Sequence, residues 1–268
     1  MSPEGLSPEQ MERYQAHLQL PGFSVAGQRR LMAARALVVG VGGLGCPIAQ
    51  YLVAAGVGTV GLADDDVVEA SNLQRQVLFD EGDCGRSKVE VAAARLRGQN
   101  PTIRIREHGT RITAANALEL VGEYDLVLDG SDNFATRYVV NDACVLAAVP
   151  LVTGSLYRFE GQVTVVAPPA TPCYRCVFRS PPREEPACHD AGLLGALAGV
   201  VGSIQAAEGL KLLGYQETTL MGRLLLVDTK QMSFRSVQLR RDPACPLCGT
   251  APSIDRPTAV AVCKPARG

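Results

Sequence analysis

The sequence has no excess of charge of either sign. Its 26 lysines and arginines nearly balance 27 aspartates and glutamates, which leaves a formal net charge of −1 at pH 7. Nucleic-acid binders usually carry a basic surface, so we expect no nucleic acid among the partners. The N-terminus lacks a basic segment followed by an apolar run, and no later stretch approaches the ~18 apolar residues of a membrane span. We therefore expect a cytoplasmic protein that contacts no membrane.

A P-loop is also absent. No segment matches G-x-x-x-x-G-K-[ST], so a bound triphosphate must be held by other groups. Cysteine, in contrast, is present nine times without a secretory signal. Cytosolic reductants keep such thiols reduced, so metal binding or catalysis is a better use for them than a disulfide framework.

Apolar runs alternate with helical patterns in the first half of the chain. Strands are predicted at residues 36–41, 59–63, 103–107, 126–129 and 151–153, and helices at about 44–55, 87–96 and 135–147. This alternation is typical of a parallel sheet with crossover helices, so the fold class is α/β and Rossmann-like. The sheet is expected to continue into antiparallel strands at 161–167, 223–228 and 233–239. A long apolar helix at 192–213 is expected to be buried on most sides.

The length of 268 residues suits one principal domain, which we expect to occupy residues 1–250. Its nucleotide-binding part is expected at about 1–155, and a part that holds a partner protein and a metal at about 156–250. Residues 168–190 are rich in proline, charge and cysteine and are expected to form a long loop. Residues 251–268 are expected to be a flexible tail.

A glycine-rich turn follows the first predicted strand. Gly40, Gly42 and Gly45 satisfy G-x-G-x-x-G, which allows close approach of the backbone to phosphate at a helix N-terminus. Asp64 ends the second strand, near the usual position of an acid that holds a ribose hydroxyl. By themselves these features also fit an NAD-dependent dehydrogenase, which is one alternative.

The loop after the second strand holds more polar side chains than an NAD site needs. It reads Asp-Asp-Asp-Val-Val-Glu-Ala-Ser-Asn-Leu-Gln-Arg-Gln over residues 64–76. Lys88 begins the next helix, and Asp132 and Asn133 follow the fourth strand. All lie after carboxyl ends of strands, where open α/β sheets bind ligands. Singly, Arg75 and Lys88 could be surface charges and Asp132 a helix cap. Their coincidence at one edge of the sheet favours a site for a nucleotide and a metal.

Four of the cysteines form two C-x-x-C pairs. Cys173 pairs with Cys176 and Cys245 with Cys248, and two such pairs supply the four ligands of a tetrahedral structural zinc. Two unrelated reduced pairs are the alternative. A closed site of four sulfurs has no open position for a substrate, so we expect it to stabilise the fold by joining the long loop to the C-terminal segment.

Together, the glycine turn, residues 64–76, Lys88, Asp132 and both C-x-x-C pairs resemble the MoeB/ThiF (HesA/MoeB/ThiF) family, which is related to ubiquitin-activating enzymes. The resemblance extends from Arg13 to Cys248. It implies a homodimeric nucleotidyltransferase that uses ATP to adenylylate the C-terminal Gly-Gly carboxylate of a small ubiquitin-like sulfur-carrier protein, with release of pyrophosphate. Carriers for molybdopterin, thiamine, cysteine and tRNA thiolation end alike, so the pathway stays open. No rhodanese-like domain follows Cys248, so a separate protein is expected as sulfur donor.

The resemblance also implies roles for individual residues. Asp64 is implied to hold the ribose, Asn72, Arg75 and Lys88 the phosphates, and Asp132 a Mg²⁺ ion; Arg75, Lys88 and Asp132 are thereby implied in catalysis. The residues implied to form the nucleotide site are Gly42, Gly43, Asp64, Asp66, Ser71, Asn72, Leu73, Gln74, Arg75, Lys88, Asp132 and Asn133.

One position departs from the family pattern. Family members usually carry an arginine that reaches the partner subunit's ATP phosphates shortly after the Arg13-Tyr14 pair, and this chain has Ala16 there. Arg13 or His17 could replace that contact. A non-catalytic scaffold that retains the fold is therefore a further alternative.

Cys188 is a candidate catalytic nucleophile. It precedes the long apolar helix, whose positive end would lower the pKa of a nearby thiol and favour the thiolate. Some relatives of the family carry a catalytic cysteine in a similar crossover loop, and the thiol would then take the activated carrier. An idle thiol fits the sequence equally well. Cys46 and Cys144 lie on apolar helix faces and are predicted to be core residues.

Overall fold

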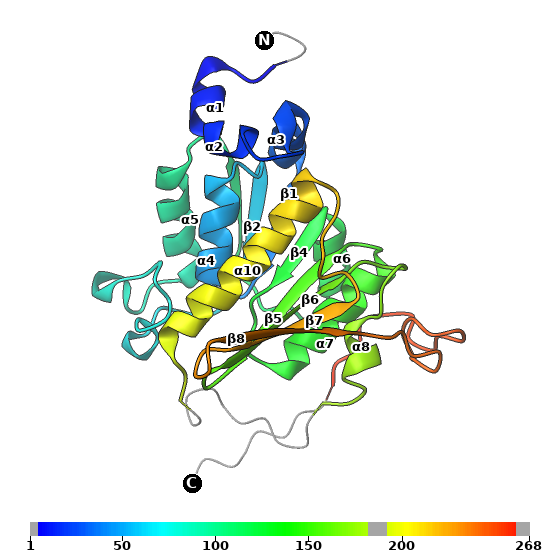
Figure 1. Ribbon diagram of the computed structural model, residues 1–268. Helices are drawn as coiled ribbons and strands as arrows, with labels where there is room; N and C mark the ends of the chain where they lie inside the picture. The colour runs from blue at the N-terminus through cyan, green and yellow to red at the C-terminus, as the bar shows by residue number, and fades with distance from the viewer. Residues whose placement is uncertain (1–4, 182–191, 261–268) are drawn as a thin grey trace.

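An eight-stranded sheet runs through the computed structural model, which describes residues 5–181 and 192–260 (Figure 1). The spatial order is β3-β2-β1-β4-β5-β6-β7-β8. The strands are β1 (Arg35–Val39), β2 (Thr59–Ala63), β3 (Arg104–His108), β4 (Leu126–Asp129), β5 (Leu151–Tyr157), β6 (Glu160–Val166), β7 (Arg223–Asp228) and β8 (Ser233–Gln238). The helices are α1 (Pro8–Arg13), α2 (Gln15–Leu18), α3 (Ser24–Ala33), α4 (Gly45–Ala54), α5 (Lys88–Gln99), α6 (Ala117–Gly122), α7 (Phe134–Leu146), α8 (Tyr174–Val177) and α10 (Gly195–Gly214), with 3-10 turns at Ala70–Asn72 and Glu81–Asp83.

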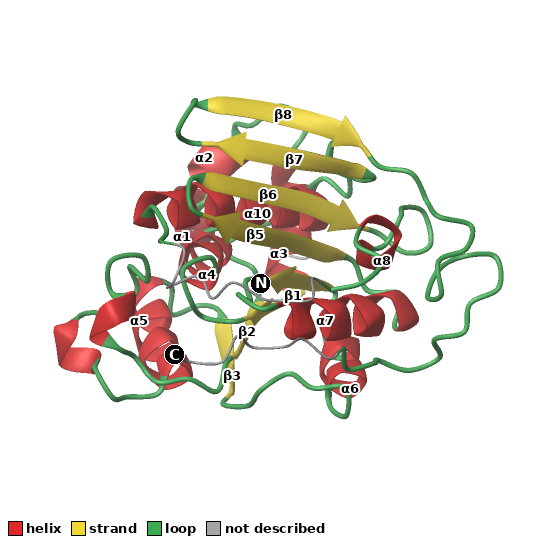
Figure 2. Cartoon of the chain, turned by 90° about the horizontal axis from the view of Figure 1, so that it is seen from below, coloured by secondary structure: helices red, strands yellow, loops and turns green. Residues whose placement is uncertain are grey.

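The sheet changes character along its width. Strands β1 to β5 pair in parallel, whereas β5 to β8 pair antiparallel and lie side by side in Figure 2. This confirms the predicted Rossmann-like sheet that continues into antiparallel strands. The chain runs outward from β1 to β3 and then returns to β4, so the strand order reverses between β1 and β4. Ligands of open α/β sheets bind at such a reversal.

Two apolar clusters cover the two faces of the sheet. Successive side chains of a strand point to opposite faces, and in β1 Val38 joins the cluster that packs under α4, α5 and α10, while Leu37 joins the cluster under α6 and α7. The same division separates Leu128 from Val127 in β4. The first layer includes α4 and α10, which lie in front of the sheet in Figure 1.

The long apolar helix, α10, departs from expectation in two ways. With 20 residues and a mean hydropathy of 1.2, it is long and apolar enough to cross a membrane by length and composition, although no such stretch was expected. It packs against α3, α4, β5 and β6, and only 44% of its apolar window is buried within the chain. Leu197 and Val201 are fully buried, but Leu194 and Val200 are 42% and 37% exposed. The helix therefore has a core side and an exposed apolar side.

The segments around the C-x-x-C pairs are attached to α7. Arg175, in the short helix α8 within the expected long loop, donates from Nε and Nη2 to Asp142 at 2.6 and 2.7 Å, and both side chains are buried. Residues 251–260 form no helix or strand, yet Ile254 packs against the α6–α7 cluster and the Thr258 amide donates to Asp142 at 3.2 Å. This first part of the expected tail is therefore held on the domain.

Candidate active site

A cavity of about 590 Å³ lies at the carboxyl ends of β1, β2 and β4. The glycine turn forms its floor because its backbone approaches the loop after β4 closely. Gly40 has φ +79°, and a Cβ there would lie 3.1 Å from the Gly130 carbonyl carbon. A Cβ at Gly45 would lie 1.9 Å from the Gly40 oxygen, so α4 can begin there only with glycine. The predicted site residues that line the cavity are Gly42, Gly43, Asp64, Asp66, Ser71, Asn72, Arg75, Lys88, Asp132 and Asn133.

Asp64 and Lys88 are linked through Asp66. The Asp64 carboxylate accepts from the amides of Val41 at 2.7 Å and Asp66 at 2.8 Å. Lys88 is only 5% exposed, and its Nζ pairs with the Asp66 carboxylate at 2.9 Å. Burial raises the pKa of Asp64, while the positive charge of Lys88 and the two amides act in the opposite direction. The network therefore fixes an acid and a cation at neighbouring places in the cavity wall.

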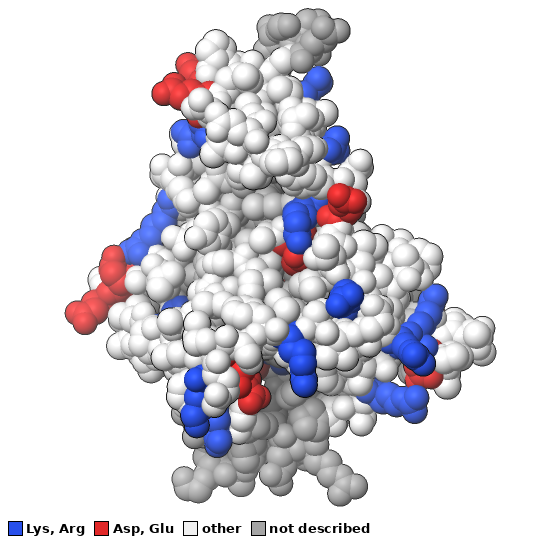
Figure 3. Space-filling view, viewed as in Figure 1, with Lys and Arg blue, Asp and Glu red and all other residues white. Residues whose placement is uncertain are grey.

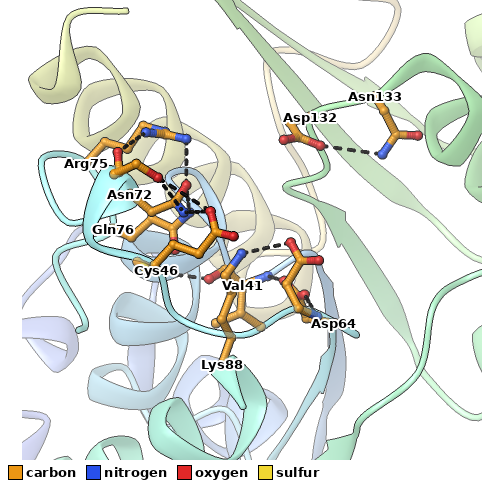
Figure 4. A network of polar contacts seen from close by, with 12 residues as sticks. Val41, Cys46, Asp64, Asn72, Arg75, Gln76, Lys88, Asp132 and Asn133 are labelled. Atoms are coloured by element: carbon orange, nitrogen blue, oxygen red, sulfur yellow. Dashed lines mark hydrogen bonds and ion pairs between the residues drawn. The ribbon is translucent and has the colours of Figure 1, made fainter. Parts of the chain in front are cut away.

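Residues 69–76 form a second network on the same side of the cavity (Figure 4). The side-chain oxygen of Asn72, Oδ1, accepts from Arg75 Nη2 at 2.8 Å and from Gln76 Nε2 at 3.2 Å. Glu69 accepts from Ser71 Oγ at 3.4 Å and from Asn72 Nδ2 at 3.1 Å. The Arg75 guanidinium is thus oriented by the protein, which the sequence could not show.

Asp132 and Asn133 face these networks from the loop after β4 (Figure 4). The helix-cap alternative for Asp132 is wrong, because Asn133 is the N-cap of α7 and accepts from the Thr136 amide at 2.9 Å. The Asp132 carboxylate lines the cavity, with the Asn133 side-chain amide 3.5 Å away. Its oxygens are therefore available to a cation or a substrate.

Two predicted residues point elsewhere, and several lining residues were not predicted. Leu73 packs against the apolar core, and Gln74 lies exposed beside Gly195 rather than in the cavity lining. Lining residues that sequence reasoning did not single out as ligands include Gln76, Arg111, Ser131 and Arg137. Arg137 lies four residues after Asn133, so its position in the first turns of α7 was the available signal.

A second cavity, of about 710 Å³, lies on the antiparallel half of the sheet. Its wall includes residues from all four antiparallel strands: Ser155, Leu156, Tyr157, Glu160, Gly161, Gln162, Leu226, Val227, Asp228, Ser233 and Arg235. Asp132, Arg137 and Leu156 line both cavities. The two cavities therefore meet at the loop between β4 and α7, the first turn of α7 and the carboxyl end of β5.

The four paired cysteines converge at one point. The Sγ atoms of Cys173, Cys176, Cys245 and Cys248 all lie within 4.8 Å of one another, with separations of 3.9 Å for Cys173–Cys176, 3.6 Å for Cys173–Cys245 and 3.3 Å for Cys176–Cys248. A tetrahedral zinc with Zn–S bonds of ~2.3 Å requires sulfurs about 3.8 Å apart, so the donor set and its size fit zinc. Burial and the neighbouring sulfurs raise the pKa of Cys173, and burial raises that of Cys176 to about 11, so the thiolate forms need a cation.

The N-terminal helices lie at the opposite end of the strands from the first cavity. Tyr14 is buried against Gly56, just before β2, and its hydroxyl accepts from Asn100 Nδ2 at 3.1 Å, just before β3. His17 contacts Gln28 at 3.3 Å and packs edge-on against Phe23. The side chains of α1 and α2 therefore lie far from the cavity of their own chain. His17 is already engaged by Gln28 and Phe23 within the N-terminal region.

Two of the remaining cysteines were predicted to be core residues. Cys46 and Cys144 are fully buried core residues, which confirms their predicted role, and burial raises the pKa of Cys46 to about 12. Cys188 lies outside the described residues.

These features define an α/β protein with a polar cavity at the carboxyl ends of its parallel strands, lined by a glycine turn and by charged side chains. The ThiF family model matches residues 14–247. The chain belongs to the ThiF family.

Relatives of known name are similar over most of the chain. A sulfur carrier protein adenylyltransferase from Thermus thermophilus is 50% identical over 252 residues, which cover 91% of this chain and 93% of that protein. Adenylyltransferase and sulfurtransferase MOCS3 from Bos taurus is 52% identical over 252 residues, 93% of this chain but only 55% of MOCS3. The SAMP-activating enzyme E1 of Haloferax volcanii is 47% identical, with 91% of each chain covered.

Solved structures show the same fold. The crystal structure of E. coli MccB with ATP matches with a TM-score of 0.74 and 26% identity, over 84% of this chain and 69% of that one. E. coli MccB alone matches with a TM-score of 0.79 and 26% identity, over 88% and 72%. This chain therefore shares its fold with a protein, MccB, whose crystal structure contains ATP.

Proposed function

We propose that this protein uses ATP to adenylylate the C-terminal Gly-Gly carboxylate of a small ubiquitin-like sulfur-carrier protein. The observation that carries the proposal is the junction of two cavities, one lined by nucleotide-binding residues and one laid along the antiparallel strands. A nucleotide in the first cavity and a protein tail in the second would meet at Asp132. The names of the relatives at 47–52% identity support the same reaction.

The reaction requires an anion to approach a polyanion. A carboxylate oxygen of the carrier attacks the α-phosphorus of ATP, an acyl–phosphate bond forms, and the bond from that phosphorus to the oxygen bridging to the β-phosphate breaks. Pyrophosphate leaves with the bonding electrons. Cations that are already oriented stabilise the charge that develops on the leaving group. Arg75 and Lys88 are proposed for this role, because hydrogen bonds to Asn72 and Asp66 hold them in the cavity wall.

Other groups in the cavity suit the remaining parts of the nucleotide. Asp64 is proposed to bind the ribose hydroxyls. Each of its carboxylate oxygens accepts from one backbone amide, which fixes the orientation of the carboxylate in the cavity wall. Asp132 is proposed to hold Mg²⁺, which would neutralise phosphate charge when bound. Adjacent carboxylates of residues 64–66 form a compact acidic group, but Asp66 is already paired with Lys88.

Assembly and metal content are part of the proposal. The exposed apolar side of α10 and its surroundings are largely free of charged side chains in Figure 3. Such a surface suits a homodimer interface. Zinc at the four cysteines is proposed to be structural because four protein sulfurs leave no open coordination position. A cytoplasmic location and a separate sulfur donor stay predictions.

The test is exchange of labelled pyrophosphate into ATP. Purified protein should support exchange only with Mg²⁺ and a carrier ending in Gly-Gly, offered one carrier at a time. Binding of NAD and ATP is measured in parallel. Tight NAD binding without ATP binding would instead identify a dehydrogenase, and ATP or carrier binding with no exchange under any carrier would identify a scaffold.

A further inference from the structure

Arg137 is a buried cation that forms no ion pair within the described residues; burial raises the pKa of the nearby Asp129, and the positive charge of Arg137 only opposes that shift from a distance. It is 7% exposed, and its Nη2 donates to the Ser131 backbone oxygen at 3.0 Å. Its Nε has no hydrogen-bond partner, and no described carboxylate lies within ion-pair distance of the guanidinium. A guanidinium offers five N–H donors, and burying one unpaired costs stability. The arrangement therefore reserves hydrogen-bonding capacity for a ligand.

The surroundings of Arg137 fix its position. The Phe134 ring lies 5.4 Å from the guanidinium carbon. Asp129 is fully buried nearby, but its carboxylate accepts instead from the Ser131 amide at 2.9 Å and from Thr153 Oγ1 at 3.1 Å. Ser131 Oγ is a second buried polar atom without a partner, and it lines the nucleotide cavity. Two unpartnered polar groups thus lie together at one wall.

That wall is the place where the two cavities meet. The first cavity, here called the nucleotide cavity, is lined by the cations Arg75, Lys88 and Arg111. The second, here called the sheet cavity, is lined by Arg235. Arg137 is the cation that lines both. An anion held at Arg137 therefore lies between a nucleotide in the first cavity and a protein tail in the second. Planar guanidinium groups bind carboxylates through two parallel hydrogen bonds.

We propose that Arg137 binds the C-terminal carboxylate of the carrier protein and presents it to the α-phosphate of ATP. This inference rests on the proposed function and adds to it a specific recognition residue. The guanidinium holds the carboxylate through two parallel hydrogen bonds, one oxygen attacks phosphorus with a lone pair that faces away from Arg137, and no proton moves in the step. The contact neutralises the carboxylate before it approaches the phosphates, so it acts mainly on carrier binding.

Binding of a short synthetic peptide ending in Gly-Gly, as the free acid and as the C-terminal amide, tests this without turnover. The wild type should bind the acid about 10- to 100-fold more tightly than the amide, the range for a charge-assisted hydrogen bond in a buried site. In Arg137→Met, which keeps an apolar side chain of similar reach, the two peptides should bind alike. Arg137→Lys should keep part of the preference, because charge remains without the planar fork.

Arg235→Met is the matched control, since it removes a cation of the second cavity that lies on β8, three strands across the sheet from Leu156 on β5. It should change binding of acid and amide by the same factor. ATP affinity of Arg137→Met, measured well below its melting temperature, should match that of the wild type. If Arg137→Met does not fold, the wild-type ratio and Arg137→Lys still decide.

Equal binding of acid and amide by the wild type overturns the inference, and so does a preference that survives Arg137→Met. Loss of ATP binding in Arg137→Met with the peptide preference intact would make Arg137 a nucleotide ligand, which also overturns it. Failure of the proposed function is a separate result, because it appears as absent pyrophosphate exchange in the wild type with every carrier.

Discussion

In the parallel half of the sheet the functional side chains follow the carboxyl ends of β1, β2 and β4, whereas in the antiparallel half they lie along the strands themselves. The first arrangement produces a cavity whose polar groups already hydrogen-bond one another, as Asp66 does with Lys88. The second produces a broad surface, and β8 is exposed at every position.

This difference between the two halves predicts how each would bind a ligand. Strand ends fix a few backbone and side-chain groups around a small molecule, so single residues there should have large effects. A strand face offers area and shape to a protein tail, so single residues should matter less, except at the junction of the cavities.

The largest effect is expected in the nucleotide half. Asp132→Ala and Arg75→Ala should each lower pyrophosphate exchange by at least ~100-fold, the scale for loss of one oriented charge contact in a transition state. Arg97→Ala is the control, since Arg97 pairs with Glu107 on the surface away from the cavity. Wild-type exchange rates in both site variants would remove these residues from the mechanism.

The cysteine cluster should affect stability rather than nucleotide binding. Metal analysis should find about one zinc per chain, and Cys245→Ser should lose the zinc and lower the melting temperature by several degrees or more, because metal binding contributes to folding. ATP affinity measured well below melting should stay near the wild-type value. Cys84→Ser, at an exposed thiol, should change neither. Full zinc content in Cys245→Ser would contradict the four-sulfur site.

The N-terminal helices offer a gain of activity. Ala16 is exposed on α2, at the position where the family resemblance implies an arginine that reaches the partner subunit's ATP phosphates. Ala16→Arg should therefore raise exchange, by about 10-fold if it restores one charged hydrogen bond. Ala16→Gln controls for side-chain length. No gain, in a protein shown to be dimeric by light scattering, would mean that another cation such as Arg13 already makes the contact.

The smallest effect concerns pH. Burial raises the pKa of Asp64, so its ionised form is lost at a higher pH than for an exposed aspartate as the solution is acidified. ATP affinity should therefore weaken a few-fold on acidification towards that raised pKa, and Asp64→Asn should bind weakly with little pH dependence. Glu119→Gln, which removes an exposed charge on α6, should keep the wild-type profile.

The same shift has a consequence for stability. Because the folded pKa of Asp64 is above its unfolded value, folding favours the protonated form, and the ionised carboxylate opposes folding at neutral pH. That penalty disappears as the pH falls through the raised pKa. Asp64→Asn should thus be slightly more stable than the wild type at neutral pH in denaturant unfolding, and an equal or lower stability would contradict the burial argument.

Much of the fold could be predicted because local patterns and tertiary structure agree in it. The apolar runs at 36–41, 59–63 and 126–129 became buried parallel strands, since a strand covered on both faces is apolar at most positions; the buried Asp129 at the end of β4 is the exception. The glycine turn could be recognised because close approach of backbones at Gly40 and Gly45 excludes side chains. The spacing of the C-x-x-C pairs likewise predicted that their four sulfurs would come together.

The sequence by itself determined the α/β class, the change from parallel to antiparallel strands, and the residue types at the cavity and at the four-cysteine cluster. Only the tertiary structure decided which of those residues face the cavity: it directed Leu73 into the core, made Asn133 rather than Asp132 the cap of α7, and brought Arg137 between two cavities. The physical reason is that motifs encode local backbone geometry and chemistry. The direction and pairing of a side chain depend on neighbours distant in sequence, which packing alone brings together.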